Sequence, residues 1–209
     1  MKLFVWDFHG TLEKGNDVKV QKICEKLLGR KVDLQLVRKL YGRTWGEYFR
    51  ELTGNDDDGE IGHLVDEAVN MGAIMTKGFM QANDYAIQVL REIKIRGDLN
   101  AVLSNTRPEH LREFLCRIGA HSLFGKIIGI SRENEVGKHN TPEYKAATIA
   151  KMIKEFSPEK VVVIGDAEND INAGMRVGAV TFMFDPWGRY PDTKADYRIT
   201  DLREVLKVY

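Results

Sequence analysis

The stretch FVWDFHGTL, residues 4–12, is the part of the sequence that decides the fold. The apolar run Leu3–Trp6 ends abruptly at Asp7, and the turn residue Gly10 follows shortly after it. A buried strand that ends in a carboxylate places that carboxylate at the edge of a sheet, where ligands bind in open α/β proteins. The stretch therefore makes Asp7 a candidate catalytic residue, and the role of His9, two residues later, has to be explained as well.

Short apolar or β-branched runs alternate with helical patterns along most of the chain. The five predicted strands are Lys2–Trp6, Leu99–Leu103, Lys126–Ile130, Lys160–Ile164 and Ala179–Met183. The helical patterns outside the long segment between the first two strands are Asn83–Gly97, Pro108–Gly119, Thr141–Phe156 and Asp170–Val177. Strands that alternate with helices indicate βαβ units and a parallel sheet. We therefore expect an α/β protein with a three-layer, Rossmann-like parallel sheet core and an inserted all-helical domain.

The inserted segment is the part of the chain where the alternation stops. It contains the amphipathic patterns Val18–Leu28, Val32–Tyr41, Trp45–Leu52 and Ile61–Met71 and lacks a convincing strand pattern. We predict that residues 1–12 and 82–209 form the core domain and that residues 13–81 form the helical domain.

The composition excludes several classes of partner. Lys plus Arg and Asp plus Glu both number 31, and this zero net charge does not favour nucleic-acid or membrane binding. An apolar run of the ~20 residues needed to cross a bilayer is absent from the sequence. Cys24 and Cys116 lack metal-ligand spacing and are expected to be buried free thiols. We expect a cytoplasmic protein with a small-molecule substrate, and the oligomeric state is left open.

Polar side chains follow each of the first four predicted strands. They are Asp7, the pair Ser104-Asn105, Lys138 in a loop, and the acidic stretch Asp166–Asp170. Each group taken alone also suits a turn, a helix cap or a solvated surface. Because the carboxyl ends of parallel strands lie at one edge of the sheet, we expect these four groups to converge.

Together these groups suit a phosphoryl group bound beside a metal ion. Asp7, Asp166 and Asp170 would repel one another unless a cation compensated them, and oxygen ligands favour Mg²⁺. The hydroxyl of Ser104, the amide of Asn105 and the ammonium group of Lys138 would serve the oxygens of an anion.

This constellation resembles the haloacid dehalogenase superfamily over essentially the whole chain. Asp7–Leu12 is similar to its nucleophile motif, and Leu103–Asn105 is similar to its second motif. Lys138 is similar to the lysine of the third motif, and Gly165-Asp166 with Asp170 is similar to the acidic fourth motif. The helical insertion lies where that family carries its C1 cap. The closing stretch Ala195–Ile199, followed by Thr200–Leu206, is similar to the end of phosphoglycolate-phosphatase-like members.

The resemblance implies a metal site and a covalent intermediate. Asp7 would be the nucleophile that forms an aspartyl-phosphate, and it would also bind Mg²⁺. Asp166 and the backbone carbonyl of His9 would be further metal ligands, and Asp170 would act directly or through water.

The resemblance also implies groups that bind the substrate. Ser104, with Asn105 and the nearby backbone, would hold phosphoryl oxygens, and Lys138 would neutralise Asp7 and the transferring group. Arg43, in the turn Tyr41–Trp45 between two cap helices, is expected to contact an anionic part of the substrate. The alternative for this turn is a simple helix–helix connection.

His9 departs from the family pattern, which usually has a second aspartate there as the general acid and base. In one interpretation His9 takes over that role, because imidazole exchanges protons near neutral pH. In a second it is a spectator in a slow phosphatase. In a third the chemistry differs, as in a phosphonatase, which would need a cap lysine. The candidate lysines are Lys14, Lys22, Lys26, Lys31 and Lys39.

The sequence thus predicts a Mg²⁺-dependent phosphatase that hydrolyses a small phosphorylated metabolite through an aspartyl-phosphate. The alternatives are a phosphonatase or phosphomutase on the same fold, or a catalytically weakened binding or regulatory protein. A dinucleotide-binding enzyme is disfavoured, because the G-x-G-x-x-G pattern does not follow the first strand.

Overall fold

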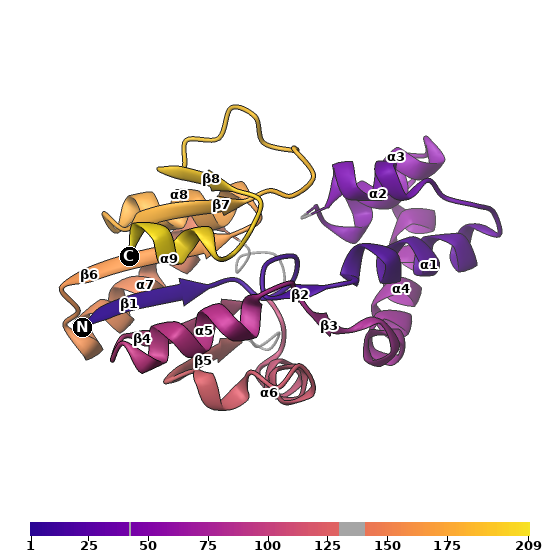
Figure 1. Ribbon diagram of the computed structural model, residues 1–209. Helices are drawn as coiled ribbons and strands as arrows, with labels where there is room; N and C mark the ends of the chain where they lie inside the picture. The colour runs from indigo at the N-terminus through magenta and orange to yellow at the C-terminus, as the bar shows by residue number, and fades with distance from the viewer. Residues whose placement is uncertain (42, 130–140) are drawn as a thin grey trace. The chain divides into compact units, whose positions relative to one another are not determined.

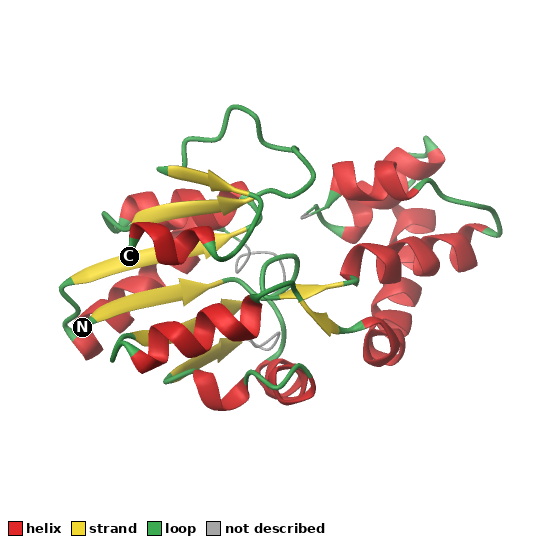
Figure 2. Cartoon of the chain, viewed as in Figure 1, coloured by secondary structure: helices red, strands yellow, loops and turns green. Residues whose placement is uncertain are grey.

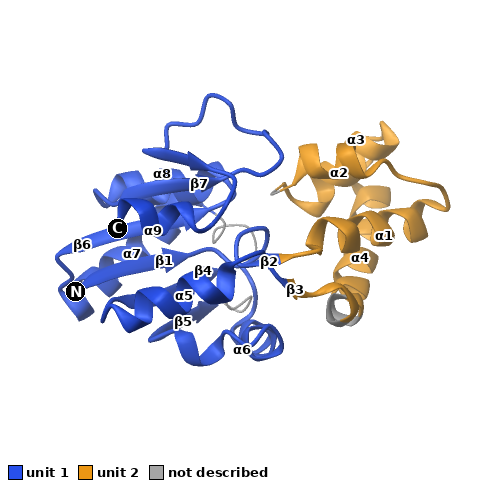
Figure 3. Ribbon diagram, in the orientation of Figure 1, with its two compact units in different colours: residues 1–13, 82–209 blue, residues 14–81 orange. Residues whose placement is uncertain are grey.

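The computed structural model describes residues 1–41, 43–129 and 141–209 of the chain. The chain divides into two compact units, which Figure 3 shows in different colours. The sheet unit comprises residues 1–13 and 82–209, and the helical unit comprises residues 14–81. Glu13 is therefore the last residue of the sheet unit before the chain enters the helical unit.

Six parallel strands form the sheet of the sheet unit, in the order β5-β4-β1-β6-β7-β8 (Figures 1 and 2). Their bounds are Lys2–Trp6 (β1), Leu99–Ser104 (β4), Lys126–Gly129 (β5), Lys160–Gly165 (β6), Val180–Phe184 (β7) and Tyr197–Ile199 (β8). The predicted Rossmann-like parallel sheet is confirmed.

Strand β1 lies in the middle of the sheet, which explains its unbroken apolar sequence. Its side chains from Leu3 to Trp6 are at most 1% exposed, because both faces of a parallel sheet are covered. Leu3 and Val5 belong to one core cluster with Ile149 and Met152. The buried indole N–H of Trp6 has a hydrogen-bond partner, because it donates to Oδ1 of Asn100 at 3.0 Å.

Helices cover both faces of the sheet and complete the three layers. Figure 1 shows α5 and α9 in front of the sheet and α7 and α8 behind it. The bounds are Ala86–Ile95 (α5), Pro108–Arg117 (α6), Pro142–Phe156 (α7), Glu168–Arg176 (α8) and Glu204–Val208 (α9), with a 3₁₀ turn at His121–Leu123. Helices α6 and α7 have proline in their first turn, where its missing N–H costs nothing.

Within its described residues, the helical unit contains four helices around their own apolar core. The bounds are Asn16–Leu28 (α1), Leu34–Leu40 (α2), Trp45–Thr53 (α3) and Asp58–Phe79 (α4). Helix α3 starts with a capping box between Thr44 and Glu47, and α4 is capped by Asp57, whose side chain accepts from the amide of Glu60. Short strands β2 (Glu13–Lys14) and β3 (Gln81–Ala82) pair where the chain leaves and re-enters the sheet unit.

The structure differs from the sequence predictions in a few elements. Strands β2, β3 and β8 were not predicted, because they have only two or three residues and show no usable periodicity. The end of the third predicted strand, Ile130, lies outside the described residues. Cys24 is buried, but Cys116 is exposed, so the predicted burial of Cys116 is wrong. Among the described residues, the helices are all too short or too polar to cross a membrane.

Candidate active site

Asp7 lies at the carboxyl end of β1, the position that the opening stretch of the sequence predicts. Its amide donates to the carbonyl of Ile164 in β6 at 2.9 Å, so the strand geometry continues to this residue. The chain then reverses in a tight turn, in which the amides of Leu12 and Glu13 both donate to the carbonyl of Phe8. Gly10 has a φ of 85°, a left-handed conformation that suits glycine.

Asp166 and Asp170 come to the same edge from the next strand along the sheet. Asp166 follows β6 directly, and Asp170 lies in the first turn of α8. Gly165 makes this approach possible, because a Cβ atom at that position would lie 2.3 Å from Cβ of Asp170 and 2.5 Å from its carboxylate.

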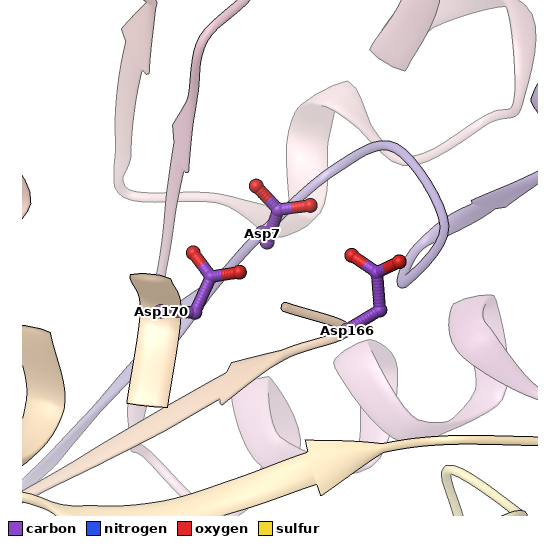
Figure 4. Close-up of side chains that lie close together, drawn as sticks. All are labelled: Asp7, Asp166 and Asp170. Carbon is purple, nitrogen blue, oxygen red and sulfur yellow. The ribbon is translucent and has the colours of Figure 1, made fainter. Parts of the chain in front are cut away.

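The three aspartates form one cluster, as Figure 4 shows. One carboxylate oxygen from each of Asp7, Asp166 and Asp170 lies within 4.8 Å of the others. Asp166 and Asp170 are 4% exposed. The convergence of three acids that the sequence predicted is thus present in the structure.

Burial and the neighbouring acids make Asp7 and Asp166 costly to ionise. Burial raises the pKa of Asp7 well above its usual range, the charge of Asp170 raises it further, and Lys145 acts in the opposite direction. Burial likewise raises the pKa of Asp166 to about 6, although Arg189 opposes the shift. Acids with strongly raised pKa values are common at functional sites.

Lys145 is the cation that the structure places beside the nucleophile candidate. Its Nζ atom lies 2.5 Å from Oδ1 of Asp170 and 3.4 Å from Oδ1 of Asp7. The lysine side chain is 4% exposed. Burial alone would lower the pKa of Lys145, but the charges of Asp170 and Asp7 outweigh it and raise the pKa. Lys145 therefore remains an ammonium ion.

The sequence prediction chose Lys138 for this place and missed Lys145. Lys138 lies outside the described residues, so its position is not part of the site described here. A signal for Lys145 was present, because Lys145, Ile149 and Met152 follow the i, i+4, i+7 spacing of one helix face and all three are buried. A lysine on an apolar stripe is a candidate for a buried ionic role.

Arg189 is a second cation at the cluster that the sequence analysis did not assign. Its Nη2 atom donates to the backbone oxygen of Asp166 at 2.8 Å and to Oδ2 of the same residue at 2.9 Å. Asp185, which is fully buried, holds the loop by accepting from the amides of Arg189 and Tyr190. The Arg189 guanidinium also lies over the rings of Trp187 and Tyr190.

Ser104 and Asn105 lie at the end of β4, the neighbour of β1, so they share the carboxyl edge with Asp7. Ser104 is buried, and its Oγ atom accepts from the amide of Thr106 at 3.2 Å. Asn105 is exposed. Arg43 is an exposed residue of the helical unit, in the turn between α2 and α3, and its amide donates to the carbonyl of Leu40.

His9 has a close carboxylate partner within the turn that follows β1. Its Nδ1 atom lies 2.9 Å from Oε2 of Glu13, whose side chain is 3% exposed. The sequence makes His9 a candidate but carries no signal that connects it with Glu13. Residues spaced i, i+4 usually meet on one face of a helix, whereas here a turn brings the two side chains together.

The cluster suits a hard divalent cation. Three carboxylates within reach of one ion offer the oxygen donors that Mg²⁺ prefers, and burial raises the pKa of two of them, Asp7 and Asp166. Lys145 engages Oδ1 of Asp170 and Oδ1 of Asp7, and Arg189 engages Oδ2 of Asp166, which leaves the other oxygen of each carboxylate for an ion. The residues present therefore fit the metal that the sequence predicts.

The fold and the site together define a Rossmann-like α/β protein with a carboxylate-rich site at the carboxyl edge of its sheet. The family model described as haloacid dehalogenase-like hydrolase matches residues 1–178. The chain therefore belongs to the haloacid dehalogenase-like hydrolase family, and the resemblance inferred from its motifs is confirmed.

Individual relatives agree with this assignment. A phosphoglycolate phosphatase of Pasteurella multocida (strain Pm70) is 26% identical over 125 residues, which cover 57% of this chain and 53% of the relative. The match thus spans about half the length of this curated relative.

Two solved structures show the same fold over nearly their whole length. A haloacid dehalogenase-like hydrolase from Streptococcus pneumoniae superposes with a TM-score of 0.79 at 18% identity and covers 99% of this chain and 97% of the other. A predicted phosphoglycolate phosphatase from Haemophilus somnus 129PT has a TM-score of 0.75 at 18% identity, and the match covers 99% of this chain and 96% of the other. At these identities the likeness establishes the fold.

Proposed function

We propose that this protein is a Mg²⁺-dependent phosphatase that hydrolyses a small phosphorylated metabolite through an aspartyl-phosphate on Asp7. The observation that carries the proposal is the cluster of Asp7, Asp166 and Asp170 with Lys145 at the carboxyl edge of the sheet. The family assignment and the phosphatase relative support the same reaction class.

Asp7 is the nucleophile in this proposal. Its carboxylate oxygen forms a bond to phosphorus while the ester P–O bond breaks, and water then cleaves the aspartyl-phosphate to release phosphate and restore Asp7. A Mg²⁺ ion held by Asp7, Asp166, Asp170 and the carbonyl of His9 would lower the repulsion between carboxylate and phosphate.

Cations and hydrogen-bond donors of the chain hold the phosphoryl group. Lys145, already an ammonium ion beside Asp7, offsets the negative charge of the nucleophile and of the transferring group. Ser104 and Asn105 bind phosphoryl oxygens from the end of β4. Lys138 keeps its predicted role as a second candidate for the neutralising lysine, and variants of the two lysines separate these assignments.

His9 acts as the general acid and base. It protonates the leaving oxygen in the first step and takes a proton from the attacking water in the second. The aspartate that usually has this role in the family is absent at position 9. Imidazole can perform both transfers near neutral pH.

The first test is hydrolysis of p-nitrophenyl phosphate by the wild-type protein and by Asp7→Asn, with Mg²⁺ or with a chelator. We expect turnover that requires Mg²⁺ and disappears in the variant. Asp66→Asn, at an exposed position of α4, is the matched control and should behave as wild type. Turnover that survives Asp7→Asn contradicts the proposal.

The substrate follows from a second test. 2-Phosphoglycolate is the first metabolite to assay, because the curated relative is named for that activity. Arg43 is proposed to contact an anionic group of the substrate, so Arg43→Ala should raise KM for the true substrate and leave kcat nearly unchanged. Lys151→Ala, which removes an exposed cation from α7, is the control. An unchanged KM in Arg43→Ala excludes the contact.

A phosphonate substrate, borohydride trapping and binding measurements separate the alternatives. A phosphonatase would cleave a phosphonate and would form a lysine adduct that borohydride traps. A binding or regulatory protein would retain metal and ligand affinity but would not turn over any phosphate ester in the panel.

A further inference from the structure

A buried glutamate faces the histidine that departs from the family pattern. Nδ1 of His9 lies 2.9 Å from Oε2 of Glu13. The glutamate side chain is 3% exposed, whereas the histidine side chain is 25% exposed. The imidazole therefore has one nitrogen engaged by an enclosed carboxylate while part of the ring remains accessible.

The backbone of the turn after β1 fixes the distance between these two residues. The amides of Leu12 and Glu13 donate to the carbonyl of Phe8 at 2.9 and 3.0 Å. The amide of Gly10 donates to the carbonyl of Glu13 at 3.0 Å. These bonds fold residues 8–13 into a closed loop, so the side chains at positions 9 and 13 are held on the same side of it.

Aromatic rings restrict the orientation of the histidine further. The ring of Phe8 lies 5.0 Å from the His9 ring at an interplanar angle of 71°, and the ring of Phe114 lies 6.0 Å away at 66°. Both are edge-on contacts. An imidazole held by two aromatic rings and one carboxylate has little freedom to flip.

A buried carboxylate costs free energy unless it has a partner, which makes the burial of Glu13 informative. The adjacent residues Thr11 and Leu12 are also buried, so Glu13 belongs to a buried stretch of the chain. A side chain that served only to fill this space would be apolar.

We propose that Glu13 is a positioning residue for His9. Its carboxylate accepts a hydrogen bond from Nδ1–H, which fixes the tautomer and the orientation of the ring and leaves Nε2 to exchange protons with the substrate. The inference rests on the proposed phosphatase function and deepens it. The His9–Glu13 pair then takes the place of the single acidic side chain that is missing at position 9.

The proton balance follows from this arrangement. In the first step, the bond between Asp7 and phosphorus forms, the ester P–O bond breaks, and the Nε2 proton of His9 passes to the leaving oxygen. In the second step, Nε2 takes a proton from water as the water oxygen bonds to phosphorus and the bond to Asp7 breaks. The Nδ1 proton stays in the hydrogen bond to Glu13 throughout.

Two substitutions of Glu13 test the role. Glu13→Met keeps an unbranched side chain but lacks an acceptor oxygen, whereas Glu13→Gln retains an oxygen that can accept from Nδ1–H. We expect Glu13→Met to lower kcat/KM on an alkyl phosphate at least ~10-fold, which is part of the ~10²–10⁴-fold that the positioned acid or base itself contributes. Glu13→Gln should recover most of that loss, and Glu67→Gln, at an exposed position of α4, should match wild type.

The leaving group distinguishes positioning from damage to the fold. An alkoxide needs a proton to leave, but p-nitrophenolate needs it much less, and kcat/KM reports the step in which the leaving group departs. Glu13→Met should therefore lower kcat/KM more on the alkyl phosphate than on p-nitrophenyl phosphate. Equal losses on the two esters overturn the proposal.

A double-mutant cycle asks whether Glu13 acts through His9. On the alkyl phosphate, Glu13→Met should have a much smaller effect in the His9→Ala background than in wild type. An equal effect in both backgrounds overturns the proposal, because it shows that Glu13 acts through something other than His9.

Nitrogen-15 NMR of the His9 ring provides a readout that does not depend on activity. At a pH where the ring is neutral, wild type should carry its proton on Nδ1, and Glu13→Met should lose this preference. A neutral wild-type ring with its proton on Nε2 overturns the positioning role even if the protein is a phosphatase. Conversely, the absence of turnover with every ester overturns the proposed function, and with it the catalytic role of the pair.

Discussion

Replacing Asp166 by asparagine should stabilise the metal-free protein while it destroys metal binding. The pKa of Asp166 is raised from 3.8 to about 6, because burial and neighbouring acids disfavour its charged form. The shift is about two pKa units, and each unit corresponds to about 1.36 kcal/mol, so ionised Asp166 costs the folded state about 3 kcal/mol. Asparagine resembles the neutral acid and can still accept from Arg189.

The pH dependence of this effect has a definite sign. A carboxyl group whose pKa is higher in the folded state contributes stability at low pH, and that contribution is lost as the pH rises from about 4 to 6. The difference in unfolding free energy between Asp166→Asn and wild type should therefore be small near pH 4 and approach about 3 kcal/mol above pH 6. Saturating Mg²⁺ should stabilise wild type and leave the variant unchanged.

Urea unfolding in a chelating buffer, repeated between pH 4 and 8 and then with Mg²⁺, measures both effects. Asp66→Asn is the control for an exposed carboxylate. The reasoning is refuted if metal-free Asp166→Asn is less stable than wild type at pH 7.5, or if Mg²⁺ stabilises the variant as much as wild type.

Three further predictions concern the groups around the cluster. Lys145→Met should lower kcat by at least ~10²-fold, because it removes the cation 3.4 Å from the nucleophile. Lys138→Met should lower kcat less. Steady-state kinetics of the two variants test this, and a larger loss in Lys138→Met would assign the neutralising role to Lys138. Gly165→Ala should lower the free energy of unfolding by about 1–3 kcal/mol and weaken Mg²⁺ binding, because the added Cβ would displace Asp170. Calorimetric titration with Mg²⁺ measures the affinity, and an unchanged affinity contradicts the prediction. Arg189→Gln should lower the melting temperature of the metal-free protein, because it removes the cation paired with the Asp166 carboxylate. Mg²⁺ should then raise the melting temperature of this variant by more than it raises that of wild type. An equal rise in the two proteins contradicts the prediction.

The sheet and the acid cluster could be predicted because the signals are local. Runs such as Leu3–Trp6 are apolar since both faces of the strand are covered, and the sequence shows this directly. The carboxyl ends of parallel strands share an edge, so acids that follow β1 and β6 are expected to meet. In the structure the carboxylates of Asp7 and Asp166 lie close together at this edge, and Asp170, four residues after Asp166, belongs to the same cluster.

The partners of these acids could not be predicted because they arise from three-dimensional packing. Lys145 comes from inside α7, and its position on the apolar stripe does not show which charges the stripe faces. Arg189 reaches Asp166 from a loop whose path depends on the buried Asp185. Glu13 meets His9 through a turn, and a turn leaves no periodic pattern in the sequence.

The measurement that tests the central claim most directly is mass spectrometry of the protein quenched in acid during turnover with Mg²⁺. The proposal predicts one added phosphoryl group on the peptide that contains Asp7, lost on treatment with hydroxylamine and absent from Asp7→Asn. The adduct should accumulate more in His9→Ala, because water attack on the aspartyl-phosphate loses its base. A phosphoryl group on another residue, or full turnover by Asp7→Asn, would contradict the account.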